Sequence, residues 1–254
     1  MSSVYLNGLE GFFREIPKAA LAFSGGVDSA YLLYEACRRG CEVRAYYVKS
    51  AFQPRFELDD AKRLAAELGA ELVVLEADVL SRREIAENSP ERCYFCKALL
   101  FGRIMQEAEK DGFSVLLDGT NASDDASDRP GMRAARELSV RSPLRECGLS
   151  KEEIRRRSRE AGLFTWDKPA YACLATRIPY GTGITNERLE ATEAAEDALM
   201  RLGFRDFRVR LSGDGARLEL REEQLPLLLA RREHVLRELK RYYKTVTLDL
   251  EVRP

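Results

Sequence analysis

Two stretches of the chain combine residue types that suit chemistry on phosphate and on sulfur. Residues 24–29 read SGGVDS, directly after the apolar residues 19–23 and before apolar residues at helical spacing. This order predicts a buried strand, a tight glycine turn and a helix that starts near Asp28. The N–H groups of such a turn and the positive end of the helix dipole converge on one spot, which favours a bound anion.

The second stretch contains two cysteines, which we consider together with a third one later in the chain. Cys93 and Cys96 form a CxxC, and Cys173 stands alone in YACLATR. A single CxxC fits a redox pair, half of a zinc site, a cluster with a distant third ligand, or an inert buried pair. Three thiolates and one open position suit an iron–sulfur cluster whose remaining iron binds an exogenous ligand. The other cysteines are expected in or near the core or in a turn: Cys37, Cys41 and Cys147.

Length and composition limit the class of protein. A chain of 254 residues with 45% hydrophobic residues allows one large domain, or a medium and a small one. The net charge of -1 creates no field for non-specific nucleic-acid binding. No apolar run is long enough for a membrane span, and the N-terminus does not resemble a signal peptide. We therefore expect a cytoplasmic protein whose cysteines are thiols or ligands rather than disulfides.

The first part of the chain alternates strand-like and helical patterns. Runs at 21–23, 43–48, 71–75 and 114–117 predict strands, and patterns at 28–39, 58–68 and 96–110 predict helices. This alternation is typical of an α/β fold with a doubly wound parallel sheet. Ligands bind beyond the carboxyl ends of such strands, where SGGVDS and the DGTNASDD of residues 118–125 both fall. Ser150 and Glu153 predict a capping box at the start of a later helix.

The pattern of residue types changes at Thr165. The stretch TWDKPAYACLATRIPYGTGIT has no clear period but is rich in apolar residues, so it predicts an ordered loop. After it come a helix at about 186–202, strands at 208–212 and 216–220, a helix at about 222–241 and a strand at 245–252. We expect a main domain at 1–165, an active-site loop at 166–185 and a small α+β domain at 186–254.

The string of strand, SGGVDS and helix resembles the signature of the PP-loop ATP pyrophosphatases. It is neither a Walker P-loop nor GxGxxG, because the required Lys-Ser or Lys-Thr and glycine spacing are absent. The resemblance implies cleavage of ATP between the α and β phosphates and adenylation of an acceptor oxygen. It implies that Ser24, Gly25, Gly26 and Ser29 cradle pyrophosphate and that Asp28 helps to hold Mg²⁺. In the DGTNASDD stretch, Gly119 allows close backbone approach and Asn121 is a candidate for bonding the nucleotide.

A closer resemblance covers nearly the whole chain. RCYFCKALLF, DGTNASDD, SPLRECGLSKEEIR and above all ACLATRIPYGTGIT are similar to segments of the LarE family. That family matures the nickel-pincer nucleotide cofactor of lactate racemase. It activates a pyridinium biscarboxylic acid mononucleotide with ATP, releases pyrophosphate and installs sulfur as a thiocarboxylate. The resemblance also implies a homo-oligomer, a hexamer in the family, and a small-molecule nucleotide substrate rather than a nucleic acid or a membrane.

The family uses two sulfur routes, and the cysteines distinguish them. In the sacrificial route a loop cysteine gives up its own sulfur and becomes dehydroalanine, whereas in the other route three cysteines hold a 4Fe-4S cluster. Sacrificial members have tryptophan where this chain has Cys93, so the resemblance favours the cluster, held by Cys93, Cys96 and Cys173. Cys173 is required in either route, and sacrificial transfer from Cys173 stays the alternative.

Several charged residues have roles by the same resemblance. Arg177, Arg208 and Arg210 are assigned to the phosphates of substrate or pyrophosphate, because the guanidinium fork binds such groups bidentately. Lys97 is assigned to offset charge that develops during adenylation. Glu196 pairs with the arginines or is an ordinary helix surface charge. For Arg208 and Arg210, alternate residues of one strand, the simpler alternative is shared exposure to solvent.

Three other readings are open from the residues alone. A PP-loop tRNA thiolase has a similar cysteine arrangement, but it needs an RNA-binding surface that this near-neutral chain does not predict. An NAD or GMP synthetase does not use a CxxC with a distant cysteine in this way. A non-enzymatic nucleotide sensor would leave the loop at 165–185 unexplained.

Overall fold

The structure, a computed structural model, describes residues 8–124 and 130–253, so Asp125 of the DGTNASDD stretch lies outside the description. The chain divides into two compact units, residues 1–79 with 91–168 and residues 80–90 with 169–254. The division falls after residue 168, within the stretch expected to be a loop. Nothing in the sequence indicated that residues 80–90 group with the later part of the chain.

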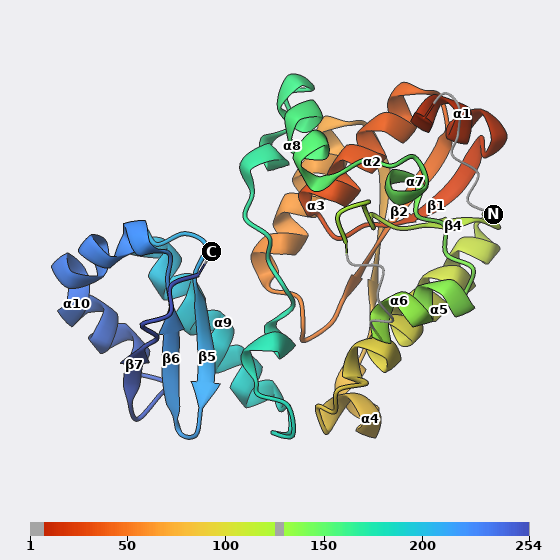
Figure 1. Ribbon diagram of the computed structural model, residues 1–254. Helices are drawn as coiled ribbons and strands as arrows, with labels where there is room; N and C mark the ends of the chain where they lie inside the picture. The colour runs from red at the N-terminus through yellow and green to blue at the C-terminus, as the bar shows by residue number, and fades with distance from the viewer. Residues whose placement is uncertain (1–7, 125–129, 254) are drawn as a thin grey trace. The chain divides into compact units, whose positions relative to one another are not determined.

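The first unit is built on a parallel sheet. Its strands are β1 (Lys18–Ala22), β2 (Glu42–Lys49), β3 (Glu71–Glu76) and β4 (Leu116–Leu117), in the order β3-β2-β1-β4 (Figure 1). All pairings are parallel, and the strand order changes direction between β1 and β4. This change defines the switch point at which open α/β sheets bind ligands.

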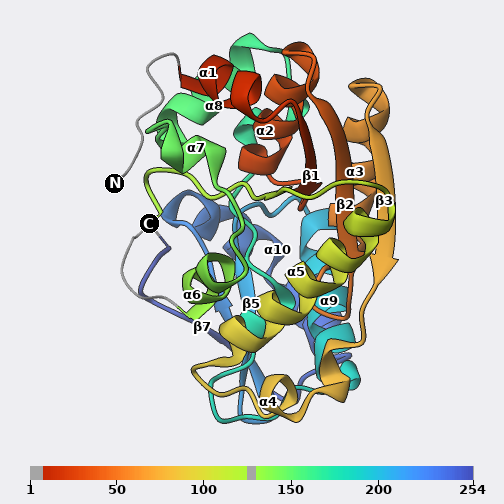
Figure 2. The same ribbon diagram turned by 90° about the vertical axis from the view of Figure 1, so that its right-hand side faces the viewer.

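Helices cover both faces of this sheet (Figure 2). One core lies under α1 (Gly8–Glu15), α2 (Val27–Arg38), α3 (Arg55–Glu67), α7 (Pro143–Glu146) and α8 (Lys151–Glu160). The other lies under α5 (Arg92–Lys110) and α6 (Pro130–Glu137). Short helices η1 (Val79–Ser81) and α4 (Arg83–Ala86) follow β3. The two cores confirm the doubly wound α/β fold.

Alternation along the strands explains why the sheet is buried on both faces. Leu21 of β1 and Tyr47 of β2 point into the first core, whereas Ala20 and Tyr46 point into the second. The expected strands and helices of this unit are confirmed within a few residues. The capping box is half formed: Ser150 Oγ accepts the N–H of Glu153 at 3.2 Å, while the Glu153 carboxylate pairs with arginines of its own helix.

The second unit is α+β. Its sheet has the order β5-β6-β7, with β5 (Arg208–Ser212) antiparallel to β6 (Gly215–Glu219) and β7 (Val246–Leu248) parallel to β6. It packs on α9 (Asn186–Arg201) and α10 (Leu225–Leu239), with η4 (Glu222–Gln224) before α10. The last strand is shorter than the expected 245–252 because only Val246–Leu248 pairs with β6. In the ranges that the structure describes, no helix is both apolar enough and long enough to span a bilayer.

The segment between α8 and α9 contains two short helical turns. These are η2 (Phe164–Asp167) and η3 (Leu174–Arg177). Cys173 directly precedes η3, and its carbonyl accepts the Thr176 hydroxyl at 2.8 Å. The expected ordered loop is therefore confirmed as a series of turns.

Candidate active site

The SGGVDS turn lies between β1 and α2, as the sequence predicts. Ser24 Oγ and Ser29 Oγ are 3.1 Å apart, and the Ser29 hydroxyl also donates to the carbonyl of Gly26 at 3.2 Å. Gly25 has φ +72°, and a Cβ there would lie 3.0 Å from the carbonyl of Glu57. The turn thus needs glycine both for its backbone conformation and for its contact with α3.

The segment after β4 approaches the same turn closely. A Cβ on Gly119 would lie 2.9 Å from the backbone nitrogen of Ser29, so this position tolerates no side chain. Next to it, the carboxylate of buried Asp118 accepts hydrogen bonds from the Thr120 N–H and hydroxyl and from the Ser142 hydroxyl. These bonds fix the conformation of the chain that follows β4, beside the glycine turn.

A pocket of about 320 Å³ opens at this point. Of the expected site residues, the structure brings Ser24, Asp28, Ser29, Lys97 and Gly119 to its wall. Several other lining residues were not singled out from the sequence: Tyr46, Tyr47, Val48, Gln53, Phe101, Asp118 and Thr120. Asp124, which the sequence offered as a loop carboxylate without a role, lines the pocket too. The pocket has a polar end at the turn and an apolar wall from β2 and α5, which suits a nucleotide with a phosphate chain and a base.

Gly25, Gly26 and Asn121 do not contribute side-chain surface to this wall. The glycines form the turn itself, and Asn121 is buried. Its side-chain oxygen accepts the N–H of Ser123 at 2.8 Å, and its own backbone N–H donates to Asp124. Asn121 therefore shapes the loop that carries Asp124 to the pocket.

Asp28 is the carboxylate of the turn and is mostly buried. One oxygen lies 2.5 Å from the ammonium group of Lys151, and the other is buried with no hydrogen-bond partner in the described structure. Burial raises the pKa of Asp28, although the nearby Lys151 counteracts part of this effect. A buried carboxylate oxygen with an open lone pair is a suitable ligand for Mg²⁺, so the residues fit this ion.

Lys97 reaches the pocket from α5. Its ammonium group lies 5.7 Å from the centre of the Phe101 ring. Within residues 8–124 and 130–253, no carboxylate forms an ion pair with it. A cation without a counterion beside a phosphate-binding turn is placed to meet negative charge on a ligand.

Cys93 and Cys96 lie one turn apart in the first half of α5, and both are half-buried. Arg92, which is buried, lies 3.6 Å from the sulfur of Cys93 and donates to it. The spacing places both sulfurs on one side of the helix, as two ligands of one group require. Across the described residues, His, Cys, Asp and Glu side chains form no ready-made cluster of three for a metal ion.

The remaining cysteines belong to the first hydrophobic core. Cys41 is buried, and Cys37 and Cys147 pack against the same core. Burial raises the pKa of the Cys41 thiol to about 11, and burial also raises the pKa of Cys147 to about 11. These thiols stay protonated at neutral pH, as expected of structural cysteines.

In the second unit, Arg177 and Glu196 form a fully buried ion pair. Arg177 Nε donates to Glu196 at 2.8 Å, and a second bond of 3.0 Å runs from Nη2. Burial alone would lower the pKa of Arg177, but the bond and charge of Glu196 outweigh it and raise the pKa. Glu196 also accepts the N–H of Val209 at 2.9 Å and the hydroxyl of Tyr171. Glu196 is therefore not a surface charge but joins α9, β5 and the cysteine loop.

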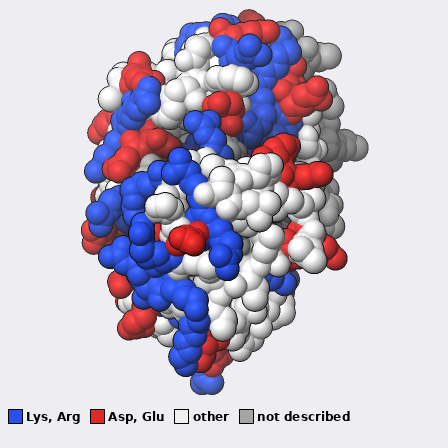
Figure 3. Space-filling model, turned by 90° about the vertical axis from the view of Figure 1, so that its left-hand side faces the viewer, with Lys and Arg blue, Asp and Glu red and all other residues white. Residues whose placement is uncertain are grey.

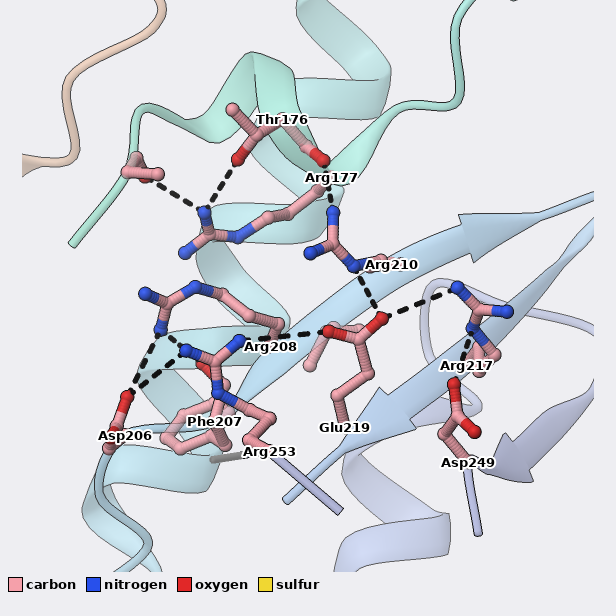
Figure 4. Close-up of polar contacts among 12 residues, drawn as sticks. Thr176, Arg177, Asp206, Phe207, Arg208, Arg210, Arg217, Glu219, Asp249 and Arg253 are labelled. Carbon is pink, nitrogen blue, oxygen red and sulfur yellow. Dashed lines mark hydrogen bonds and ion pairs between the residues drawn. The ribbon is translucent and has the colours of Figure 1, made fainter. Parts of the chain in front are cut away.

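Arg208 and Arg210 of β5 lie near Arg177, among the carboxylates of Asp206 and Glu219 (Figure 4). Arg208 is buried and donates to the carbonyls of Phe207 and Ala170, whereas Arg210 donates to Glu219 and to the Thr176 carbonyl, both at 2.5 Å. Burial and then the positive charges of Arg177 and Arg253 lower the pKa of Arg208 to about 10. A crowded set of cations such as this one is favourable for an anion.

Two residues that the sequence did not single out hold the cysteine loop. Tyr171 lies against two guanidinium groups, at 4.5 Å from Arg177 and 5.2 Å from Arg208. Asn88 is buried, and its amide donates to three carbonyls of the segment 178–182 at 2.8 to 3.2 Å. Asn88 has φ +57°, a conformation that asparagine tolerates. The signal in the sequence is the Asn-Ser-Pro of residues 88–90, which is typical of a turn.

The surface charge is uneven. Lys and Arg side chains gather over much of the face drawn in Figure 3, with Asp and Glu among them. Exposed side chains of α10 include Arg231, Arg232 and Arg237. The surface therefore has locally basic regions although the net charge of the whole chain is only -1.

Comparison with known proteins agrees with the class of protein that the sequence predicts. The family model described as queuosine biosynthesis protein QueC matches residues 18–89, which contain the glycine turn. An uncharacterized protein of Synechocystis sp. is 37% identical over 97% of this chain and 93% of its own length. The pyridinium-3,5-bisthiocarboxylic acid mononucleotide synthase of Lactiplantibacillus plantarum is 35% identical over 93% of this chain and 87% of its own length. A tRNA-specific 2-thiouridylase, MnmA of Thermotoga petrophila, is 27% identical over 58% of this chain and 52% of its own length.

The fold, the glycine turn at the switch point and these similarities define an ATP-dependent sulfur transferase of the PP-loop class. Within that class, the chain belongs to the LarE family.

Proposed function

We propose that this enzyme uses ATP to adenylate a carboxylate of a pyridinium biscarboxylic acid mononucleotide and then converts that carboxylate to a thiocarboxylate. This reaction would serve maturation of the nickel-pincer nucleotide cofactor of lactate racemase, in the cytoplasm. The observation that carries the proposal is the pocket whose wall joins Ser24, Asp28 and Lys97, in a chain 35% identical to a synthase of the bisthiocarboxylic acid product.

The first step is adenylation. A carboxylate oxygen of the substrate attacks the α-phosphorus of ATP, and the bond from that phosphorus to the bridging oxygen breaks, releasing pyrophosphate. The N–H groups of the SGGVDS turn and the hydroxyls of Ser24 and Ser29 hold the leaving pyrophosphate. Asp28 would hold Mg²⁺, which neutralises phosphate charge, and Lys97 offsets charge on the α-phosphate.

The second step is sulfur transfer. A sulfur nucleophile attacks the acyl carbon of the adenylate, and the bond to the AMP oxygen breaks so that AMP leaves with the electron pair. We assign Cys93, Cys96 and Cys173 as ligands of a 4Fe-4S cluster, which when bound supplies this sulfur as a replaceable sulfide. All three are half-buried, which is compatible with ligands that a cluster can reach. Cys37 and Cys147 are half-buried as well, but they pack against the first hydrophobic core.

The substrate's own phosphate needs a separate site. We assign Arg208 and Arg210 to this phosphate, and we assign the buried ion pair of Arg177 and Glu196 to their support. Burial and then the adjacent guanidinium groups lower the pKa of Arg208, and the adjacent cations support an anionic partner there. The same family membership is the basis for expecting a homo-oligomer.

Anaerobic reconstitution tests the sulfur route. Iron and sulfide are quantified on wild type, on Cys93→Ala, Cys96→Ala and Cys173→Ala, and on Cys147→Ala as a matched control outside the set. About four irons per chain, lost in the first three variants and kept in the control, are expected. No iron on a folded chain would favour the sacrificial route, and mass spectrometry after one turnover would then find Cys173 lighter by hydrogen sulfide.

A second measurement tests the substrate. Pyrophosphate release from ATP and Mg²⁺ is followed with the carboxylated nucleotide and, separately, with tRNA. Release that requires the nucleotide is expected. Release only with tRNA, together with salt-dependent tRNA binding, would instead identify a tRNA thiolase.

A further inference from the structure

The side chain of Lys168 lies on the glycine turn. Its ammonium group is 2.6 Å from the carboxylate of Asp60 on α3 and 3.3 Å from the carbonyl oxygen of Gly25. It also lies 5.4 Å from the centre of the Phe56 ring, and the side chain is only 14% exposed. Lysines are rarely this enclosed without a structural or functional reason, because burial of the ammonium group is costly.

The contact with Gly25 acts on the neighbouring N–H. The carbonyl of Gly25 and the N–H of Gly26 belong to one peptide group, and in a trans peptide they point in opposite directions. Two successive glycines do not fix the orientation of that peptide by their own sterics. Among the described residues, the Gly26 N–H contacts a single acceptor, Ser24 Oγ, at the long distance of 3.4 Å.

The segment that carries Lys168 is itself held. The guanidinium group of Arg155 donates to the carbonyl of Trp166 at 2.6 Å and to that of Lys168 at 2.7 Å. The ammonium group is therefore anchored through its own main chain, through Asp60 and through Gly25. Cys173 follows Lys168 by only five residues in the sequence.

We propose that Lys168 is a positioning residue of the phosphate turn, which holds the Gly25 carbonyl so that the Gly26 N–H faces the β- and γ-phosphates of ATP. The inference rests on the proposed function, since it assumes that ATP occupies this pocket. Lys168 does not touch the reacting atoms. Its effect is confined to ligands that place phosphate on the turn.

Affinity for three ligands separates this role from a structural one. Calorimetry measures binding of ATP, pyrophosphate and AMP, each with Mg²⁺, to wild type and to Lys168→Met. ATP and pyrophosphate are expected to bind about tenfold more weakly to the variant, and AMP within about twofold of wild type. Lys62→Met is the matched control, because Lys62 is an exposed lysine on the same helix as Asp60.

A double variant separates positioning from charge. Lys168→Met with Asp60→Asn removes one charge of each sign, so a purely electrostatic effect would be restored. The positioning role predicts that ATP still binds weakly, whereas recovery of affinity would overturn it. Equal loss of ATP and AMP affinity with a lower melting temperature would also overturn it. Failure of wild type to bind ATP would instead refute the proposed function, and this inference with it.

Discussion

The ammonium group of Lys151 lies 2.5 Å from one oxygen of Asp28, while the other oxygen of that carboxylate is buried without a hydrogen-bond partner among the described residues. An unsatisfied buried acceptor costs about 1–3 kcal/mol. The turn therefore contains a destabilised carboxylate oxygen that a bound cation would satisfy. This arrangement is typical of sites in which stability is given up for binding.

Replacement of Asp28 by asparagine is expected to remove the dependence of ATP binding on Mg²⁺. The asparagine side chain keeps the shape of the aspartate but loses the negative charge that a hard cation requires. Adenylation should fall by about a hundredfold or more, because charge neutralisation at the phosphates is lost. Calorimetry with Mg²⁺ and with a chelator checks the prediction, and an unchanged ratio of the two affinities would contradict it.

The same substitution is expected to change the pH dependence of stability. Burial raises the pKa of Asp28, so ionisation is less favourable in the folded than in the unfolded chain. Wild type therefore loses stability as the pH rises from the ordinary aspartate pKa through the raised value, and the asparagine variant does not.

Without Mg²⁺, the variant should melt above wild type at pH 7, because asparagine carries no charge whose burial opposes folding. The difference should vanish near pH 3, at about the lower limit of aspartate ionisation. Thermal unfolding across this range is the measurement, and a difference independent of pH would show that the charge of Asp28 is not its cause.

Local patterns were sufficient for most of the fold. Alternation and short apolar runs report which side of an element is buried, so the parallel sheet, the glycine turn and the strand of residues 208–212 were all predicted. The turn chemistry of Ser24 to Ser29 depends on neighbours in sequence, and its position at the switch point follows from strand order.

Long-range pairing was not predictable in the same way. From the sequence, Glu196 could pair with the arginines or be an ordinary helix surface charge. The structure shows that it is buried and that Arg177, nineteen residues earlier, donates to it. Residues 80–90 join the second unit through the amide of Asn88, which no periodicity reveals. The role of Lys168 was likewise not predictable, because it depends on α3 and the glycine turn, which lie beside it only in the folded chain.

Asn88 is expected to be a main anchor of the loop after Cys173. Asn88→Ala removes three hydrogen bonds and leaves three carbonyls of segment 178–182 without this donor. A loss of about 2–3 kcal/mol is expected. Asn88→Gly tolerates the φ of +57° and should be less destabilising than alanine, so comparing the two separates the side-chain bonds from backbone strain. Denaturant unfolding measures both, and wild-type stability in both would contradict the assignment.

The core cysteines are expected to resist alkylation. Burial raises the pKa values of Cys41 and Cys147 to about 11, so at pH 8 only ~0.1% of each is thiolate. In cluster-free protein, iodoacetamide should modify them about a hundredfold more slowly than a free thiol. Peptide mass spectrometry over a time course follows each site, and rapid labelling of Cys147 in the folded chain would disprove its core position.

The arginine cluster of the second unit is expected to bind inorganic phosphate. Burial and then the positive charges of Arg177 and Arg253 lower the pKa of Arg208, so an anion there relieves repulsion that Glu196 and Asp206 compensate only in part. At a phosphate concentration about ten times the dissociation constant, wild type should gain about 1.4 kcal/mol, or about 3–5 °C in melting temperature.

Arg208→Met should lose this gain, while Arg217→Met, with a half-exposed side chain on the neighbouring strand, should keep most of it. Chloride at equal ionic strength is the control for screening, because general charge effects would raise the melting temperature equally. If phosphate and chloride act alike on wild type, the cluster is a structural network rather than an anion site. A phosphate-specific gain that depends on Arg208 would mean that this buried guanidinium group binds an anion in addition to its 3.9 Å ion pair with Asp206 and its hydrogen bonds to the carbonyls of Phe207 and Ala170.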